Sequence, residues 1–434
     1  MTFFYTSVMV LILIFIVKKY KDIFHPICIN GLIWLIFPLF YEILCVFYSN
    51  MEFLSDKFFV YILSYFIIFT IFCEIAINGK RREKKNALIS VAVLDSNKKR
   101  LLQNTKHLKH LMQLECFLNI LLILEIFRTV NTWNYSQAMV MFRYYQVFEP
   151  QKFSLILRLL RYTFSLTAPT ICYVYLFHPK HKKIYSTVLI LQCCIILPIY
   201  GSKGFIMKFF LLFFFMLYFN GKINPSSLII LFITGVVGIY FMTMVRDASF
   251  MSDYTYLDYI FVYALTPFKA FDGMINGLVP FPDRPIGSRS WGFFYRVASR
   301  LFGFALPPAE ERYWVNIPAP SGQDVPTNVF TGLGNHYMDF GLIGIMMYGA
   351  LFGIVLGLLY RGFAAKRDNP IKMVYILISY CIVFQFFGDE LFGFMSMPLQ
   401  DLIASFIVFK RLRIHEIFKY NGIHTDIIKD AQIC

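Results

Sequence analysis

The chain contains a series of apolar segments that are long enough, or nearly long enough, to cross a bilayer, and this restricts its fold more than any other feature. A helix needs about 20 apolar residues to cross about 30 Å of hydrocarbon. Hydrophobic residues make up 58% of the 434 residues, charged residues 15%, and mean hydropathy is +0.60. These values are typical of polytopic membrane proteins, so the sequence predicts an all-α integral membrane fold.

Reading the apolar segments along the chain predicts about 11 transmembrane helices. They lie at about 3–17, 27–48, 58–77, 111–130, 153–177, 184–200, 205–219, 228–244, 339–360, 373–392 and 395–409. The predicted organisation is helices 1–8 in residues 1–244, a large loop at 245–338 with short amphipathic helices, helices 9–11 at 339–409 and a tail at 410–434. Segment 259–279 is a further apolar element, but Lys269 and Asp272 argue against a full crossing.

Basic residues predict the sidedness of the chain. They concentrate at 79–110 and in the C-terminal Lys410, Arg411 and Arg413, and short cytoplasmic loops carry such an excess. This places the N-terminus, the large loop and its neighbours on the outer side of a cytoplasmic membrane. The formal charge of +15 is then a topology signal, and no nucleic-acid partner is expected. Lys18 and Lys19 follow the first span, which we expect to stay as an anchor.

Motifs for several enzyme and transporter classes are missing from the sequence. There is no G-x-x-x-x-G-K-[ST] loop, no H-E-x-x-H, no G-x-S-x-G, no D-x-D pair and no Cys/His cluster with metal-ligand spacing. ATP-driven transport, zinc protease and serine hydrolase chemistry are therefore disfavoured. We expect no cofactor and no metal site.

Cations at several outer helix ends are unusual, because charges inside lipid are costly and tend to be functional or paired. The predicted topology supplies such cations from five outer ends of the chain, and the residues are Arg128, Arg143, Arg158, Arg161, Lys203 and Arg246. Two alternatives remain open for each of them. A nearby carboxylate neutralises the charge, or the side chain extends to a lipid phosphate.

The large loop contains a predicted amphipathic helix at 288–304. At about 100° per residue, its Arg289, Arg296 and Arg300 fall within an arc of about 40°, opposite an aromatic and aliphatic face. Guanidinium groups bind diphosphates through bidentate hydrogen bonds. The alternative is a helix that only anchors the loop to anionic headgroups. The Pro-rich stretch 306–326 after it is expected to form an irregular cover.

His336 is the only one of eight histidines on the predicted outer side. Imidazole is well suited to proton transfer near neutral pH, so His336 is a candidate catalytic base. Asp339 is a candidate to orient it or to act itself, and Asp389 and Glu390 serve either as alternative bases or as balancing charges. The alternative is that His336 is a hydrogen-bonded interfacial residue.

Three glycines recur at four-residue spacing in the ninth predicted span: Gly349, Gly353 and Gly357. A stripe of small residues lets two helices approach closely. It predicts helix packing and no chemistry.

Several of these features occur together in one known family. The chain resembles the O-antigen polymerase (Wzy) family, in Gly201-Ser202-Lys203-Gly204 at an outer turn, in Arg246 after the following hairpin, in the large outer loop, and in the N-x-F-T … Y-x-D-F-G-x-x-G run at Asn328–Gly344. Lys203 stands where many members have arginine.

The resemblance implies transfer of a growing glycan from undecaprenyl diphosphate to a new lipid-linked repeat unit, on the periplasmic face of a bacterial inner membrane. The reaction would be inverting and metal-independent, with His336 or Asp339 as the base. A chain-length regulator protein and membrane lipid are further expected partners. The residues then expected to bind substrate are Arg143, Arg158, Arg161, Lys203, Arg246, Arg289, Arg296, Arg300 and Tyr337.

Three other functions remain as alternatives. A lipid-linked oligosaccharide flippase also needs cations for a diphosphate, but it would distribute charge through both leaflets. An O-antigen ligase would carry a similar loop and similar charges. A membrane acyltransferase would place a histidine in a pocket within the inner spans.

Overall fold

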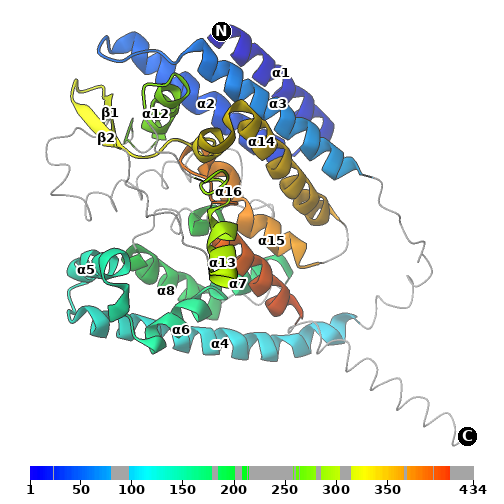
Figure 1. Ribbon diagram of the computed structural model, residues 1–434. Helices are drawn as coiled ribbons and strands as arrows, with labels where there is room; N and C mark the ends of the chain where they lie inside the picture. The colour runs from blue at the N-terminus through cyan, green and yellow to red at the C-terminus, as the bar shows by residue number, and fades with distance from the viewer. Residues whose placement is uncertain are drawn as a thin grey trace, which may run out of the picture. The chain divides into compact units, whose positions relative to one another are not determined.

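The computed structural model describes residues 1–22, 24–79, 97–177, 184–200, 208–212, 214, 258, 261–262, 264–279, 285–303, 314–365, 369–393 and 395–410. This part of the chain is mostly helical (Figure 1). Five of its helices are long and apolar enough to cross a membrane: Thr2–Tyr20, Pro26–Phe47, Asp56–Asn78, Leu108–Val130 and Gly334–Ala364. The chain is therefore a multi-pass membrane protein, as predicted. The eighth predicted span, at 228–244, lies outside the described residues, so the count of 11 stays a prediction.

The chain divides into two compact units. The first comprises Met1–Gly79, Asp247–Arg367 and Ile378–Leu399, and the second comprises Lys80–Arg246, Asp368–Leu377 and Gln400–Cys434. Neither unit is continuous in the sequence.

The first unit is built on four long helices: α1 (Thr2–Tyr20), α2 (Pro26–Phe47), α3 (Asp56–Asn78) and α14 (Gly334–Ala364). Its shorter elements are α12 (Thr266–Ile275), α13 (Gly292–Phe302), α16 (Tyr380–Val383) and the 3-10 helix η2 (Phe384–Phe386). Helix α3 begins at Ser55, whose hydroxyl accepts a hydrogen bond from the Phe58 amide. Such a cap satisfies an amide that has no partner within the helix.

The glycine stripe packs α14 directly against α3, which confirms the packing prediction. Gly349, Gly353 and Gly357 each face backbone carbonyls of α3. A Cβ atom on Gly353 would lie 2.5 Å from the carbonyl oxygen of Phe69. The two helix backbones therefore approach too closely for any side chain larger than hydrogen.

Helix α14 is bent near its start. Gly341 has φ 62° and ψ −145°, which are not helical values. Beyond the bend, a Cβ atom on Gly344 would lie 2.1 Å from the carbonyl oxygen of His336. Gly341 and Gly344, the two glycines of the D-F-G-x-x-G run, thus permit a sharp turn that side chains would block. The ninth predicted span, at 339–360, is consequently part of a longer helix with a separate first segment.

The Pro-rich stretch 306–326 was expected to be irregular, but its described part, from residue 314 onward, includes regular β-structure. Strands β1 (Val315–Pro318) and β2 (Asp324–Thr327) form an antiparallel hairpin, with Val315 opposite Thr327. The Ala319 amide donates to the Gln323 carbonyl at 2.9 Å, and Gly322 has φ 85°. A turn with a glycine in the left-handed region closes the hairpin, a short-range signal that the proline content concealed.

Two short helices in the predicted large loop, α12 and α13, agree with the prediction of short helices there. Helix α12 has ten residues, too few to cross a bilayer, as Lys269 and Asp272 suggested. Helix α13 occupies residues 292–302 of the predicted 288–304 and ends at Gly303, which has φ 73°. A left-handed glycine at this position is the common helix terminator.

The second unit contains α4 (Asn97–Val130), α5 (Tyr135–Phe148), η1 (Pro150–Lys152), α6 (Leu155–Phe164), α7 (Thr167–Phe177), α8 (Tyr185–Tyr200) and α15 (Ile371–Ile378). The predicted span at 153–177 is not one continuous helix, because α6 and α7 are separated by a turn. Pro169 has no amide proton to continue the helix, and the Ser165 and Leu166 amides instead bond to Tyr162 and Thr163 in i to i−3 fashion. The predicted span at 373–392 is likewise divided among α15, α16 and η2.

Candidate functional site

A buried histidine and aspartate form the centre of the first unit's polar chemistry. The Nε2 atom of His336, in the first turn of α14, lies 3.0 Å from Oδ2 of Asp389. The side chains are only 4% and 1% exposed, respectively. A carboxylate that holds one imidazole nitrogen fixes the orientation of the ring and leaves the other nitrogen for chemistry.

Backbone contacts bring these two distant residues together. The Gly332 amide donates to the Gln385 carbonyl at 2.7 Å, and a Cβ atom on Gly332 would lie 3.2 Å from the Gly388 carbonyl oxygen. Thr331, just before it, has φ 61°, a strained conformation for a β-branched residue. Such strain persists where the surroundings enforce it, and it commonly accompanies functional sites.

Asp389 accepts hydrogen bonds on both carboxylate oxygens. Oδ1 accepts from the amides of Leu391 and Phe392 at 3.1 and 2.9 Å, and Oδ2 accepts from the amide of Gly393 at 2.9 Å. An amide N–H only donates, so lone pairs of the Asp389 oxygens receive all three of these bonds. The tautomer of His336 that carries its proton on Nε2 donates to Oδ2 and completes this set of donors.

The other ring nitrogen of His336, Nδ1, is left with its lone pair. It has no hydrogen-bond partner among the described residues. Several polar atoms of the described residues are fully buried without a partner, and Nδ1 is not among them. Nδ1 therefore keeps some accessible surface. The ring stacks on Tyr348, with centroids 4.1 Å apart, and meets the edge of Trp291 at 6.5 Å. His336 therefore has the geometry of an oriented base.

Asp339 does not orient His336, contrary to the prediction. Its Oδ2 accepts from the amides of Ser290 and Arg289 at 2.7 and 3.2 Å, and its Oδ1 lies 3.9 Å from the Arg289 guanidinium. Both side chains of this pair are nearly buried. Asp339 thus fixes the segment before α13, and Arg289 faces a carboxylate of the same unit instead of being presented for substrate.

Helix α13 presents the two other arginines of the predicted amphipathic segment 288–304. Arg296 and Arg300 are exposed, and no residue of α13 is buried. The helix begins after Trp291, whose ring packs near His336. At 1.5 Å per residue, the two arginines lie about 8 and 14 Å further along the helix axis. The helix that carries these two arginines therefore starts beside the histidine.

Tyr337 has a packing role in the structure. Its ring contacts Phe271 and Tyr61, and its hydroxyl donates to the carbonyl of Ile275 at 3.4 Å. These contacts join the start of α14 to α12 and α3.

The second unit holds three of the predicted substrate-binding arginines. Arg158 is exposed on α6, where it donates to the Pro150 carbonyl at 3.2 Å. Arg161 lies over the rings of Phe142 and Phe153, with distances of 6.0 and 5.4 Å to the ring centroids. Arg143 is half-buried on α5. Within the described residues, no carboxylate lies in ion-pair range of Arg158.

The remaining outer cations divide into two groups. Lys203 and Arg246 lie outside the described residues. Arg128, by contrast, is neutralised locally: its guanidinium donates two hydrogen bonds to Glu125, at 2.6 and 2.8 Å. For this residue the ion-pair alternative is correct.

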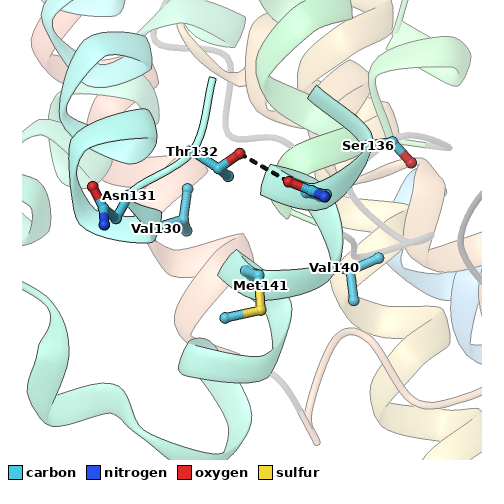
Figure 2. Close-up of a pocket in the computed structure, with 7 residues that line it drawn as sticks. Val130, Asn131, Thr132, Ser136, Val140 and Met141 are labelled. Atoms are coloured by element: carbon cyan, nitrogen blue, oxygen red, sulfur yellow. Dashed lines mark hydrogen bonds between the residues drawn. The ribbon is translucent and has the colours of Figure 1, made fainter. Parts of the chain in front are cut away.

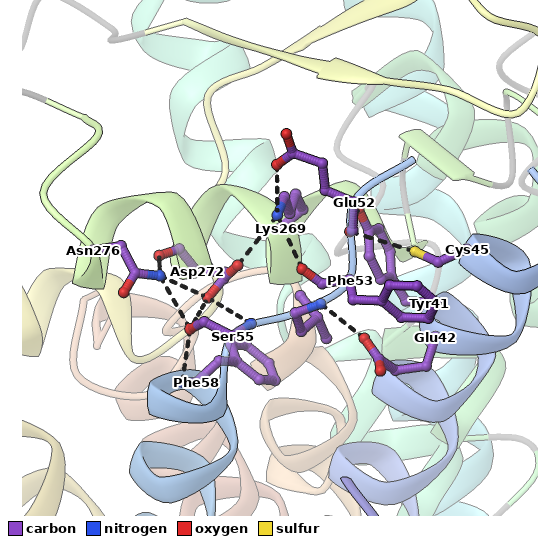
Figure 3. Close-up of polar contacts among 11 residues, drawn as sticks. Tyr41, Glu42, Cys45, Glu52, Phe53, Ser55, Phe58, Lys269, Asp272 and Asn276 are labelled. Carbon is purple, nitrogen blue, oxygen red and sulfur yellow. Dashed lines mark hydrogen bonds and ion pairs between the residues drawn. The ribbon is translucent and has the colours of Figure 1, made fainter. Parts of the chain in front are cut away.

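Lys269 and Asp272 form a polar cluster that joins α12 to the start of α3 (Figure 3). Asp272 accepts from the Ser55 amide and hydroxyl at 3.2 and 2.5 Å and from Asn276 at 3.0 Å. Lys269 lies 3.3 Å from Asp272 and 3.2 Å from Glu52. All these groups have partners, so the cluster is structural.

An open cleft of about 470 Å³ lies in the second unit, between the end of α4 and α5 (Figure 2). Its lining residues are Val130, Asn131, Thr132, Ser136, Gln137, Val140 and Met141. No titratable side chain is among them. The cleft lining therefore offers no group for general acid or base chemistry.

Sequence reasoning named His336 and Asp389 but did not pair them, and it missed two other polar groups. One is Gln385, buried beside Tyr348 in the first unit. The other is an ion pair in the second unit, where Lys208 Nζ lies 2.6 and 2.5 Å from the two Asp401 oxygens. Gln385, Lys208 and Asp401 are polar residues within predicted apolar spans, and this position was the signal that could have identified them.

No protein-family model matches this chain, and no curated protein and no solved structure matches it either.

Proposed function

We propose that the chain is a glycosyltransferase of the O-antigen polymerase type, which joins undecaprenyl-diphosphate-linked repeat units on the periplasmic face of a bacterial inner membrane. The observation that carries the proposal is the His336–Asp389 pair: an imidazole held by a carboxylate through Nε2, with Nδ1 unpartnered among the described residues. It lies at the start of α14, beside the origin of the arginine-bearing helix α13.

In the proposed reaction, Nδ1 of His336 accepts the proton of the acceptor sugar hydroxyl. The acceptor oxygen then bonds to the anomeric carbon of the donor, while the bond from that carbon to the diphosphate oxygen breaks. The electron pair leaves with undecaprenyl diphosphate. Attack from the opposite face inverts the anomeric configuration.

Arg296 and Arg300 are assigned to the leaving diphosphate. They are exposed on one side of α13, and guanidinium groups stabilise the negative charge that develops as the glycosidic bond breaks. The resemblance gives the same ligand to Arg143, Arg158, Arg161, Lys203 and Arg246, and these assignments stay predictions. A regulator of chain length is a further proposed partner.

Deletion of the gene in its own bacterium, read out on a glycan gel, tests the proposal. A polymerase mutant loses the polymer ladder but keeps one repeat unit attached to lipid. Loss of that single unit as well indicates a flippase or a ligase and overturns the proposal. Activity of the purified protein in chelator is expected to be undiminished, and strict dependence on a divalent ion would contradict the mechanism.

A further inference from the structure

A chain of buried polar side chains extends from Asp389 to helix α2. The hydroxyl of Tyr348 donates to Asp389 Oδ1 at 3.4 Å and accepts from Nε2 of Gln385 at 3.2 Å. Oε1 of Gln385 accepts from the Trp34 indole at 3.1 Å and from the Tyr65 hydroxyl at 2.6 Å. All five side chains are buried, so water cannot substitute for a missing partner.

Trp34 sets the direction of this hydrogen-bond chain. An indole N–H can only donate, so the group facing it must be the amide oxygen of Gln385. The amide NH₂ then faces Tyr348 and donates to its hydroxyl oxygen. With that oxygen accepting, the hydroxyl proton of Tyr348 is directed towards Asp389.

The direction matters because Asp389 also holds His336. Three backbone amides and Tyr348 already donate to its carboxylate. Each donor withdraws charge from the oxygen that it contacts, and linked hydrogen bonds polarise one another in a low-dielectric interior. The state of the Tyr348 hydroxyl therefore tunes the Asp389–His336 hydrogen bond.

We infer that Trp34, Gln385 and Tyr348 are positioning residues that act as one unit, directing the Tyr348 proton to Asp389 and thereby setting the hydrogen bond that orients His336. The catalytic meaning of this inference rests on the proposed function. The hydrogen-bond chain itself is a property of the resting protein and is testable without any substrate.

Tyr348 contributes in two separable ways. Its ring stacks on the His336 ring, with an interplanar angle of 24°, and its hydroxyl bonds to Asp389. Tyr348→Phe removes the hydroxyl and keeps the ring. Trp34→Phe removes the one partner of Gln385 that can only donate. The remaining partner, the Tyr65 hydroxyl, can donate or accept, so Gln385 can then turn its oxygen towards Tyr348.

The test records the proton resonance of the His336 Nε2–H group in full-length, ¹⁵N-histidine-labelled protein in lipid bilayers, with His336→Gln to assign the signal. Trp34→Phe and Tyr348→Phe are both expected to move it downfield, because Asp389 loses a donor and binds His336 more strongly. The double variant is expected to match Tyr348→Phe alone, because both changes act through one hydroxyl. Tyr5→Phe is the control, since it removes a buried hydroxyl that donates to the Trp34 carbonyl.

An unchanged resonance in Trp34→Phe, or effects that add in the double variant, would overturn the inference. A shift of equal size in Tyr5→Phe would also overturn it, because general loosening of the core would then explain the result. If the proposed function holds, turnover in both single variants falls by about 10- to 100-fold, with the same lack of additivity. A protein without polymerase activity that still shows the resonance pattern would refute the function and leave the hydrogen-bond chain standing.

Discussion

His336 and Asp389 are 53 residues apart in the sequence, yet Nε2 of the histidine lies 3.0 Å from the aspartate carboxylate. The histidine comes from the first turn of α14, and the aspartate from the turn that follows η2. Asp339, three residues from His336, is not its partner, because Asp339 is held by the Ser290 and Arg289 amides. The pair is thus a product of the tertiary fold.

Replacing either member of this pair is expected to abolish most glycosyl transfer. His336→Gln removes the base and Asp389→Asn removes the charge that orients it, and general-base catalysis contributes roughly 10²- to 10⁴-fold. The measurement is the rate of polymer formation from purified lipid-linked repeat units in proteoliposomes. His110→Gln, at an exposed position on α4, is the matched control and should retain full activity. Normal rates in both site variants would exclude His336 as the base.

Close helix packing predicts a strong effect of adding a side chain at Gly353. Gly353→Val places a Cβ atom within 2.5 Å of the Phe69 carbonyl oxygen, and a backbone carbonyl cannot move aside as a side chain can. Overpacking of this kind costs about 1–3 kcal/mol. Thermal unfolding in detergent should show the loss. Gly273→Ala, whose Cβ would meet only ordinary contacts at 3.7 and 4.0 Å, should show none.

The sequence predicted what depends on local pattern. Apolar length identified the five long spans, and the four-residue spacing of glycines predicted that another helix packs closely on α14, although not that this helix is α3. The amphipathic period located α13, and the charges Lys269 and Asp272 excluded a crossing by α12.

What the sequence could not predict depends on contacts between distant segments. The pairing of His336 with Asp389 requires the Gly332–Gln385 backbone bond, which no periodicity reports. Asp339 was favoured as its partner because it is only three residues away. The β1–β2 hairpin was missed because its prolines were taken as a sign of irregular structure, although Gly322 supplies the turn.

The buried pair of Lys208 and Asp401 is expected to respond asymmetrically to mutation. Their side chains are 5% and 2% exposed. Lys208→Met or Asp401→Leu alone leaves an uncompensated buried charge, which costs about 3–5 kcal/mol. The double variant removes both charges and should regain most of the lost stability. Thermal unfolding and membrane expression level measure this, and a double variant as unstable as the two single losses added together would contradict it.

His25, between α1 and α2, predicts acid sensitivity of the fold. Burial, with a smaller contribution from the Lys19 charge, lowers the pKa of His25 from 6.5 to about 3. The side chain caps α2 by accepting the Ile27 amide proton on Nδ1 at 3.3 Å, and protonation of Nδ1 would remove that acceptor. The folded state therefore requires a neutral imidazole.

The sign of the pH dependence follows from these values. Between pH 6.5 and about 3, the unfolded chain binds a proton at His25 that the folded chain does not. The free energy of unfolding consequently decreases as the pH falls through this window, by about 1.4 kcal/mol per pH unit from this residue. His25→Asn keeps a competent helix cap without a titrating group, so its unfolding temperature should decline less steeply on acidification than that of the native protein. Parallel curves for the two proteins in detergent would show that another group controls acid unfolding.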